Sequence, residues 1–318
     1  MKSLLFSLLI VITGIGYSLD CSPKSEVIAT EERSVEQLEE LAEKGDLEAM
    51  CEIAHCYLIG DGVKKDAQQA IKWWRKAADQ RNARAQFNLG VAYKNGDGVE
   101  KDLEQSLQWF KKAAEQNLPQ AQFNLAINYE HGIGVTKNLQ TALEWYQKAA
   151  EQDYMEAQCN LGLLYLNGGD GFKKDEKKAI YWLIKAAEKE DTIAQNRLAK
   201  CYMSGRGVPE DLKKAIQLLQ KSADQGDAEG AFLLAICLME KQPKVAVKWL
   251  KSAAEKGDAD AQFVLGTLYF YGKHVPTSLD LSEQWIRKAA AQGQPDAKDF
   301  LKQVPFKLLK GEGSLLIK

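Results

Sequence analysis

An internal repeat of about 36 residues runs through most of the chain and constrains the fold more than any other feature. Successive units begin 36, 36, 36, 37, 36, 31 and 36 residues apart when the chain is aligned on the small residue that opens each unit. These residues are Ala49, Ala85, Ala121, Ala157, Ala194, Gly230, Ala261 and Ala297. A period of roughly 20 to 50 residues is typical of arrays in which each unit buries its apolar face against the next. The sequence therefore predicts a stacked repeat array.

Each unit has the pattern of two helices joined by a glycine-containing turn. In the first helix, apolar residues at the first, fifth and ninth positions share one face, as Ala85, Leu89 and Tyr93 do in the second unit. The second helix begins after a residue such as Asp102, which can accept hydrogen bonds from the first turn. Six of the seven tryptophans recur at one position of the second helix, and only Trp74 does not. We therefore expect a helical hairpin whose second helix buries an alanine and this tryptophan.

The first 18 residues have the pattern of a secretory signal peptide. One lysine precedes an apolar run from Leu4 to Ile15, and small residues lie at its end. This run is shorter than the roughly 20 residues that cross a bilayer, so cleavage is favoured over a permanent span. Lipid modification at Cys21 is an alternative. We expect an exported protein, periplasmic or secreted, with no integral membrane span in the mature chain.

The rest of the chain divides according to the phase of the repeat. Residues 19–33 are polar and predict a tether, and residues 34–48 hold only a second helix, as expected of an N-terminal capping half-repeat. Residues 297–318 begin another first helix that Pro305 interrupts, which predicts a C-terminal cap and tail. Seven repeats are expected within residues 49–296, at 49–84, 85–120, 121–156, 157–193, 194–229, 230–260 and 261–296.

Charge and motif content argue against nucleic-acid binding and catalysis. The 42 basic and 44 acidic residues are interspersed and give a formal net charge of -2, which leaves no electrostatic footprint for nucleic acid. The three histidines, His55, His131 and His274, lie at least two repeats apart and cannot converge on one site. The motifs GxSxG, HExxH and CxxC do not occur. We expect no enzyme activity, no cofactor and no metal site.

On these residues the chain resembles the Sel-one-like repeat proteins, relatives of the tetratricopeptide arrays, whose pattern AxxxLGxxYxxGxGVxxDxxxAxxWxxKAAEQG recurs from roughly residue 35 to residue 301. The resemblance implies an all-α fold, a right-handed superhelical solenoid of helix-turn-helix repeats with a concave face lined by first helices. It also implies an adaptor that binds a protein or peptide partner. The sixth unit departs from the pattern, because LMEKQPKVAVKWL replaces the glycine loop and makes residues 239–245 a place where function or mechanics could differ.

The cysteines bear on an alternative function within the same family. One secreted branch, described as β-lactamase-like or penicillin-binding, carries a cross-linked cysteine pair in most units. Here Cys51 and Cys56 point about 140° apart on one helix. Cys201 and Cys237 take equivalent positions in adjacent units, so their Cα atoms are expected about 10 Å apart, beyond the roughly 7 Å limit for a bridge. We expect small buried thiols, and the hydrolase remains an alternative, as does a secreted host-directed effector.

A binding surface is predicted on the face of each first helix that lies opposite its core residues. Asn88, Asn124 and Asn160 are expected to form a ladder able to hold an extended peptide backbone, flanked by aromatic and aliphatic side chains. The alternative is that these asparagines belong to the repeat pattern and that some of the phenylalanines pack between units. The candidate protein-binding residues are Phe87, Asn88, Asn95, Phe123, Asn124, His131, Asn160, Asn167, Arg197 and Lys200.

Overall fold

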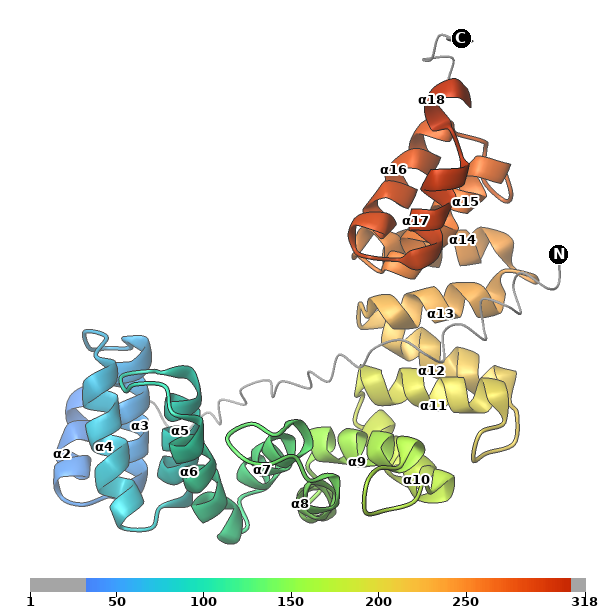
Figure 1. The fold of residues 1–318 in the computed structure, drawn as a ribbon. Helices are drawn as coiled ribbons and strands as arrows, with labels where there is room; N and C mark the ends of the chain where they lie inside the picture. The colour runs from blue at the N-terminus through green and yellow to red at the C-terminus, as the bar shows by residue number, and fades with distance from the viewer. Residues whose placement is uncertain (1–32, 310–318) are drawn as a thin grey trace. The chain divides into compact units, whose positions relative to one another are not determined.

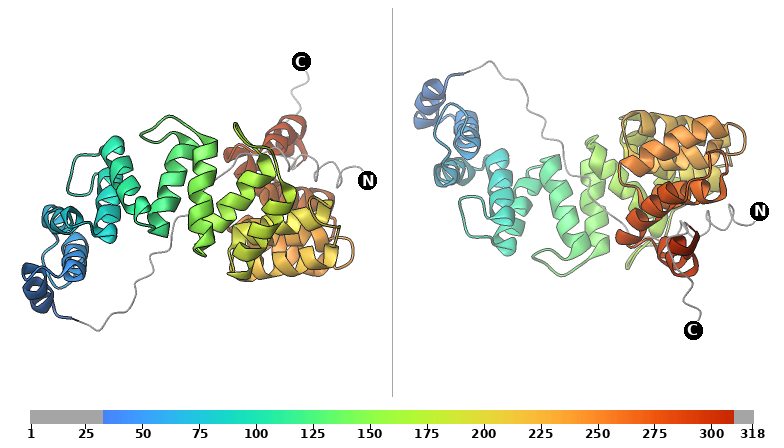
Figure 2. Two further views of the ribbon diagram at one scale, coloured as in Figure 1. Left: turned by 90° about the horizontal axis from the view of Figure 1, so that it is seen from below. Right: turned by 90° about the horizontal axis from the view of Figure 1, so that it is seen from above.

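The computed structural model describes residues 33–309, and its helices from Val35 onward form one unit (Figure 1). The expected signal peptide, Cys21, nearly all of the tether and the last nine residues of the tail lie outside this described part. Within it the prediction of an all-α array of helical hairpins is confirmed, and each helix packs on the next one in the chain (Figure 2). None of its helices is both long and apolar enough to cross a membrane.

The array consists of alternating first and second helices, with further helices at both ends. The first helices are α3 (Leu47–Ile59), α5 (Ala83–Asn95), α7 (Pro119–His131), α9 (Met155–Asn167), α11 (Thr192–Ser204), α13 (Ala228–Leu238) and α15 (Ala259–Tyr271). The second helices are α4 (Ala67–Asp79), α6 (Leu103–Glu115), α8 (Leu139–Glu151), α10 (Glu176–Glu188), α12 (Leu212–Asp224), α14 (Pro243–Glu255) and α16 (Leu279–Ala291). Before them lies α2 (Val35–Glu43), and after them lie α17 (Pro295–Gln303) and α18 (Phe306–Leu309).

The glycine loop between the two helices of a repeat ends the first helix and caps the second. Gly96 ends α5 in the left-handed region, at φ 89°, and its N–H donates to the Ala92 carbonyl. The side chain of Asp102 then accepts from two N–H groups in the first turn of α6. Gly98 packs so closely on the start of α4 in the preceding repeat that a Cβ on it would lie 2.5 Å from the carbonyl oxygen of Ala67. The loop therefore also joins one repeat to the one before it.

The repeat tryptophan is not the core residue of the second helix, and the expectation that it is buried there is wrong for most repeats. Trp73 and Trp109 are half-buried, whereas the residues after them, Trp74 and Phe110, are buried. The reason is the helical phase, because the following residue points to the centre of the apolar face and the tryptophan to its edge. Lys112 lies over the Trp109 ring at 4.0 Å and covers its outer side. At the equivalent position Trp145, Trp249 and Trp285 are half-buried, and Trp182 is buried.

Adjacent repeats are matched through the third residue of one repeat and the N-cap residue of the next first helix. The Phe123 ring packs on Tyr154, with the ring centroids 5.4 Å apart. At another junction the Asn196 side chain donates to the Asp227 carboxylate at 2.7 Å. An apolar pair at one junction and a polar pair at the other therefore take the same place in the repeat. This pairing gives each junction its own chemistry although the backbone repeats.

Repeat six is shorter than the others because both its first helix and the turn after that helix have fewer residues. Helix α13 has 11 residues instead of 13, and a four-residue connection, 239–242, replaces the usual seven-residue loop. Met239 is buried with right-handed helical backbone angles, so no glycine is needed there. Without this loop nothing covers the first turn of the preceding second helix, and Leu212 is 48% exposed. The departure at residues 239–245 therefore changes the surface locally and keeps the hairpin.

Candidate protein-binding surface

The aromatic candidate in repeat three does not line an open surface. Phe123 is fully buried and packs between Tyr146, at 5.7 Å between ring centroids, and Tyr154, at 5.4 Å. Tyr146 belongs to the second helix of the same repeat, and Tyr154 is the N-cap residue of the next first helix. Phe123 therefore joins the repeats to each other, and the expectation that it contacts a partner is wrong.

The asparagine ladder is also interrupted by burial. Asn124 is 9% exposed, and its side-chain amide donates to the Gln120 carbonyl of its own helix at 2.9 Å. Asn160 is 4% exposed, and its amide donates to the Tyr146 hydroxyl at 3.2 Å. Neither side chain lies on an open surface where it could hold an extended peptide. The expected ladder is wrong for these two residues, and the alternative that they belong to the packing of the repeat describes them better.

The remaining candidates in repeats two to four lie nearer the surface. Phe87 is half-buried against Phe110, with ring centroids 5.6 Å apart. Asn88 is half-buried and lines a small cavity. The last residues of α5, α7 and α9 are exposed, and these are the candidates Asn95, His131 and Asn167. The candidates that reach solvent thus lie at the C-terminal ends of first helices.

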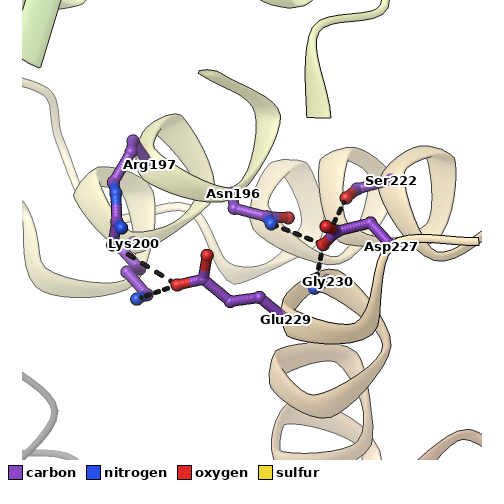
Figure 3. Close-up of polar contacts among 7 residues, drawn as sticks. All are labelled: Asn196, Arg197, Lys200, Ser222, Asp227, Glu229 and Gly230. Atoms are coloured by element: carbon purple, nitrogen blue, oxygen red, sulfur yellow. Dashed lines mark hydrogen bonds and ion pairs between the residues drawn. The ribbon is translucent and has the colours of Figure 1, made fainter. Parts of the chain in front are cut away.

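Repeat five brings the two basic candidates together on one acidic residue. The Lys200 ammonium lies 2.6 Å from Glu229 Oε1, and the Arg197 guanidinium lies 3.3 Å from the same oxygen (Figure 3). The side chains of Lys200, Arg197 and Glu229 are 25%, 30% and 35% exposed, respectively. Burial alone would raise the pKa of Glu229, but Lys200 and Arg197 outweigh it and hold this pKa below its usual range. Two cations on one carboxylate leave one positive charge unmatched within the cluster.

A second hydrogen-bond cluster holds α13 close to α11 and so positions Glu229. One oxygen of Asp227 accepts from the Gly230 N–H at 2.6 Å, the Asn196 amide at 2.7 Å and the Ser222 hydroxyl at 3.2 Å (Figure 3). A Cβ on Gly230 would lie 2.4 Å from the Ser222 hydroxyl oxygen, so glycine is required by this close approach. The sequence carried a signal for this cluster, because serine and glycine here replace alanines of the repeat pattern, but a single-helix pattern does not show what they contact.

Burial disfavours the reactive thiolate form of several cysteines in the described part. Cys51, Cys56, Cys159, Cys201 and Cys237 form no disulfide with one another. Burial raises the pKa of Cys51 to about 12 and that of Cys237 to about 11, so both are protonated at neutral pH. Within residues 33–309, no group of three or more His, Cys, Asp or Glu side chains is arranged to hold a metal ion.

Comparison with known proteins places the chain in a family of helical repeats. It is 30% identical to a Sel1 repeat protein from Oxalobacter formigenes over 94% of this chain and 85% of that one, with a TM-score of 0.69. It is 32% identical to a protective antigen present in uropathogenic Escherichia coli strains, which displays an SLR fold, over 87% of this chain and 68% of that one, with a TM-score of 0.55. No curated protein matches it.

The family model named Sel1 repeat matches the chain seven times. The matched segments are 47–82, 83–118, 119–154, 156–191, 192–227, 229–258 and 259–294. Each match begins at, or one residue after, the first residue of a first helix. Together the matches span most of the chain, and the chain therefore belongs to the Sel1 repeat family.

Proposed function

We propose that this protein is an interaction scaffold that binds a protein or peptide along its first helices. Sel1 repeat proteins are generally protein-interaction scaffolds, and the family is a non-catalytic one. The observation that carries the proposal is the cluster of Arg197 and Lys200 on Glu229, because the two cations of α11 exceed the one carboxylate of α13 that they share. The partner segment is accordingly one that carries a carboxylate.

The cluster suits recognition better than it suits stability. Ion pairs that are a quarter to a third exposed contribute only about 0 to 1 kcal/mol to stability. Complementary charges at an interface increase the association rate and exclude partners of the wrong charge. Glu229 keeps both cations ordered in the free chain, so an incoming carboxylate meets donors that are already positioned. The cost of ordering two long side chains is then met before binding.

We also propose that the protein is exported. The pattern of residues 1–18, which lie outside the described part, favours a periplasmic or secreted protein, with lipid attachment at Cys21 as a variant. One relative is described as a protective antigen, which is consistent with an exported location. Fractionation of cells that produce the tagged full chain tests this, and recovery of the protein in the cytoplasm with residues 1–18 intact would contradict it.

Crosslinking in intact cells, followed by mass spectrometry, tests the binding surface. In Arg197→Gln/Lys200→Gln/Glu229→Gln the cluster becomes neutral without leaving a lone buried charge, and we expect recovery of the wild-type partner to fall at least tenfold. Glu229→Gln alone frees both cations and should keep or raise that recovery. Lys213→Gln, at an exposed lysine of a second helix, changes the net charge by the same single unit and is the matched control. Equal recovery with the triple variant and the wild type would refute the assignment.

A further inference from the structure

A small cavity lies between the first two repeats, and we refer to it as the Trp74 cavity. Its volume is about 90 Å³, enough for a water molecule or a group of a few non-hydrogen atoms. It is bounded by α3, α4 and α5 and by the loop that follows α5. Its lining includes Trp74, His55, Leu58, Asn88, Ala92 and Asp97.

The indole N–H of Trp74 has no hydrogen-bond partner among the described residues. Trp74 is only 3% exposed, so it cannot turn this group to solvent without leaving the core. A buried donor without an acceptor is destabilising, and most buried donors in folded proteins are paired. Trp109 also has an unpaired indole N–H, but Trp109 is half-buried and borders a hollow of about 370 Å³. Asn128 and Ser282 also carry buried side-chain donors without a partner among the described residues, and Trp74 differs from them in lining this small cavity.

The equivalent place two repeats later shows how the chain satisfies such a donor. Tyr146 occupies there the position of Trp74, and its hydroxyl donates to the Glu130 carboxylate at 2.7 Å. The same hydroxyl accepts from the Asn160 amide at 3.2 Å. The residue that corresponds to Glu130 in the first repeat is Leu58, which offers no acceptor. The first repeat therefore has the donor without the partner that the third repeat supplies.

The space beside Trp74 coincides with a smaller side chain at one repeat position and a more exposed one at another. Ala92 lines the cavity, and the corresponding residue two repeats later is the buried Leu164. His55 is exposed, and its counterpart is the half-buried Ile127. The same backbone therefore leaves a cavity here and forms a packed contact two repeats later, in which the Tyr146 hydroxyl is hydrogen-bonded.

We propose that the Trp74 cavity receives a primary carboxamide, the side chain of an asparagine or glutamine in a bound peptide. The carbonyl of this group would accept from the Trp74 indole, and its NH₂ would donate to the oxygens of Asn88 or Asp97. Asp97 makes the site unfavourable for a carboxylate, and the unpaired indole makes it unfavourable for a purely apolar group. The proposal rests on the proposed function, because the carboxamide belongs to the bound partner segment.

The test follows the indole resonances of the ¹⁵N-labelled full chain by NMR, with Trp74 assigned from the Trp74→Phe variant. N-acetyl-glutamine N-methylamide is the probe, and the methionine and glutamate derivatives are its apolar and anionic controls. We expect the Trp74 indole proton to shift downfield and to saturate with the glutamine probe alone. A Trp74 resonance that does not move, or that moves equally with the methionine derivative, overturns the proposal.

Two variants locate the response in the cavity. Ala92→Leu fills the space as Leu164 does, and Leu58→Glu supplies an internal acceptor as Glu130 does for Tyr146. Each should weaken binding of the glutamine probe at least tenfold, and Leu58→Glu should shift the Trp74 resonance even without probe. Unchanged binding in both folded variants would refute the site. This outcome is separable from failure of the proposed function, because the NMR experiment needs no cellular partner.

Discussion

Replacement of Gly230 by alanine, the residue that opens every other repeat, should destabilise this protein. Alanine is more favourable than glycine within a helix by about 0.8 to 1.0 kcal/mol, so propensity alone predicts a gain. A Cβ at this position would lie 2.4 Å from the Ser222 oxygen, 2.8 Å from the Ser222 Cβ and 2.9 Å from the Asn196 amide oxygen. Overpacking of a buried site costs about 1 to 3 kcal/mol, and three contacts this short place Gly230→Ala in the upper part of that range. We expect a net loss of about 1 to 2 kcal/mol.

The partner substitution tests whether the clash is the cause. Every other junction has alanines at both positions, eight residues apart, as in Ala113 with Ala121. The double variant Ser222→Ala/Gly230→Ala restores that pair and removes the closest contact, although it gives up a 3.2 Å hydrogen bond to Asp227 worth about 1 kcal/mol. Most of the loss in Gly230→Ala should therefore be recovered, with a coupling energy of about 1 kcal/mol or more.

The assay is urea unfolding of the four proteins of this cycle by circular dichroism, together with native-state hydrogen exchange. Repeat arrays can unfold in parts, so exchange of the amides of α12 and α13 shows whether the effect is local. Faster exchange confined to these helices in Gly230→Ala, and near-normal exchange in the double variant, is the expected pattern. If Gly230→Ala were more stable than the wild type, or if the double variant were as unstable as the single one, the steric argument would be refuted.

Two further predictions concern a buried carboxyl and the core of the second helices. Burial raises the pKa of Asp258 to about 6 from 3.8, so the folded state binds its proton more tightly than the unfolded state. The free energy of unfolding should therefore fall as the pH rises from about 4 to about 6. Asp258→Asn keeps an N-cap side chain, and its free energy of unfolding should rise relative to that of the wild type by about 1 to 3 kcal/mol across that window. Urea unfolding between pH 4 and pH 8 measures this difference. A difference that does not change with pH would contradict the prediction. Phe110→Ala should cost about 3 to 5 kcal/mol because its ring is fully buried, and Trp109→Ala should cost distinctly less. Equal losses of unfolding free energy in the two variants would show that the tryptophan contributes as much to the core as the phenylalanine.

The local features of the repeat could be predicted from the sequence because each depends on nearby residues. Asp102 caps α6, and Gly96 ends α5, as their residue types and spacing indicated. The binding candidates depended instead on which faces of a first helix are covered. A first helix packs on the second helix of its own repeat and on the neighbouring repeats, so Phe123 and Asn160, placed opposite the core on one helix, are buried by others. A pattern read on one helix cannot show contacts that come from the next repeat.

Residues that depart from the repeat pattern bring polar groups into the array. Some of these groups find a hydrogen-bond partner within the chain, and others do not. At the junction of repeats five and six, Ser222 and Gly230 replace two alanines, and together with Asp227 they satisfy one another through hydrogen bonds. These substitutions are therefore explained by the fold, and the binding argument there rests on the excess charge beside them. At the first junction, Trp74 brings a donor into the core while Leu58 supplies no acceptor. Local rules are broken without internal compensation mainly where a function requires it, and the unpaired Trp74 donor beside a cavity is the departure to which we assign a ligand group.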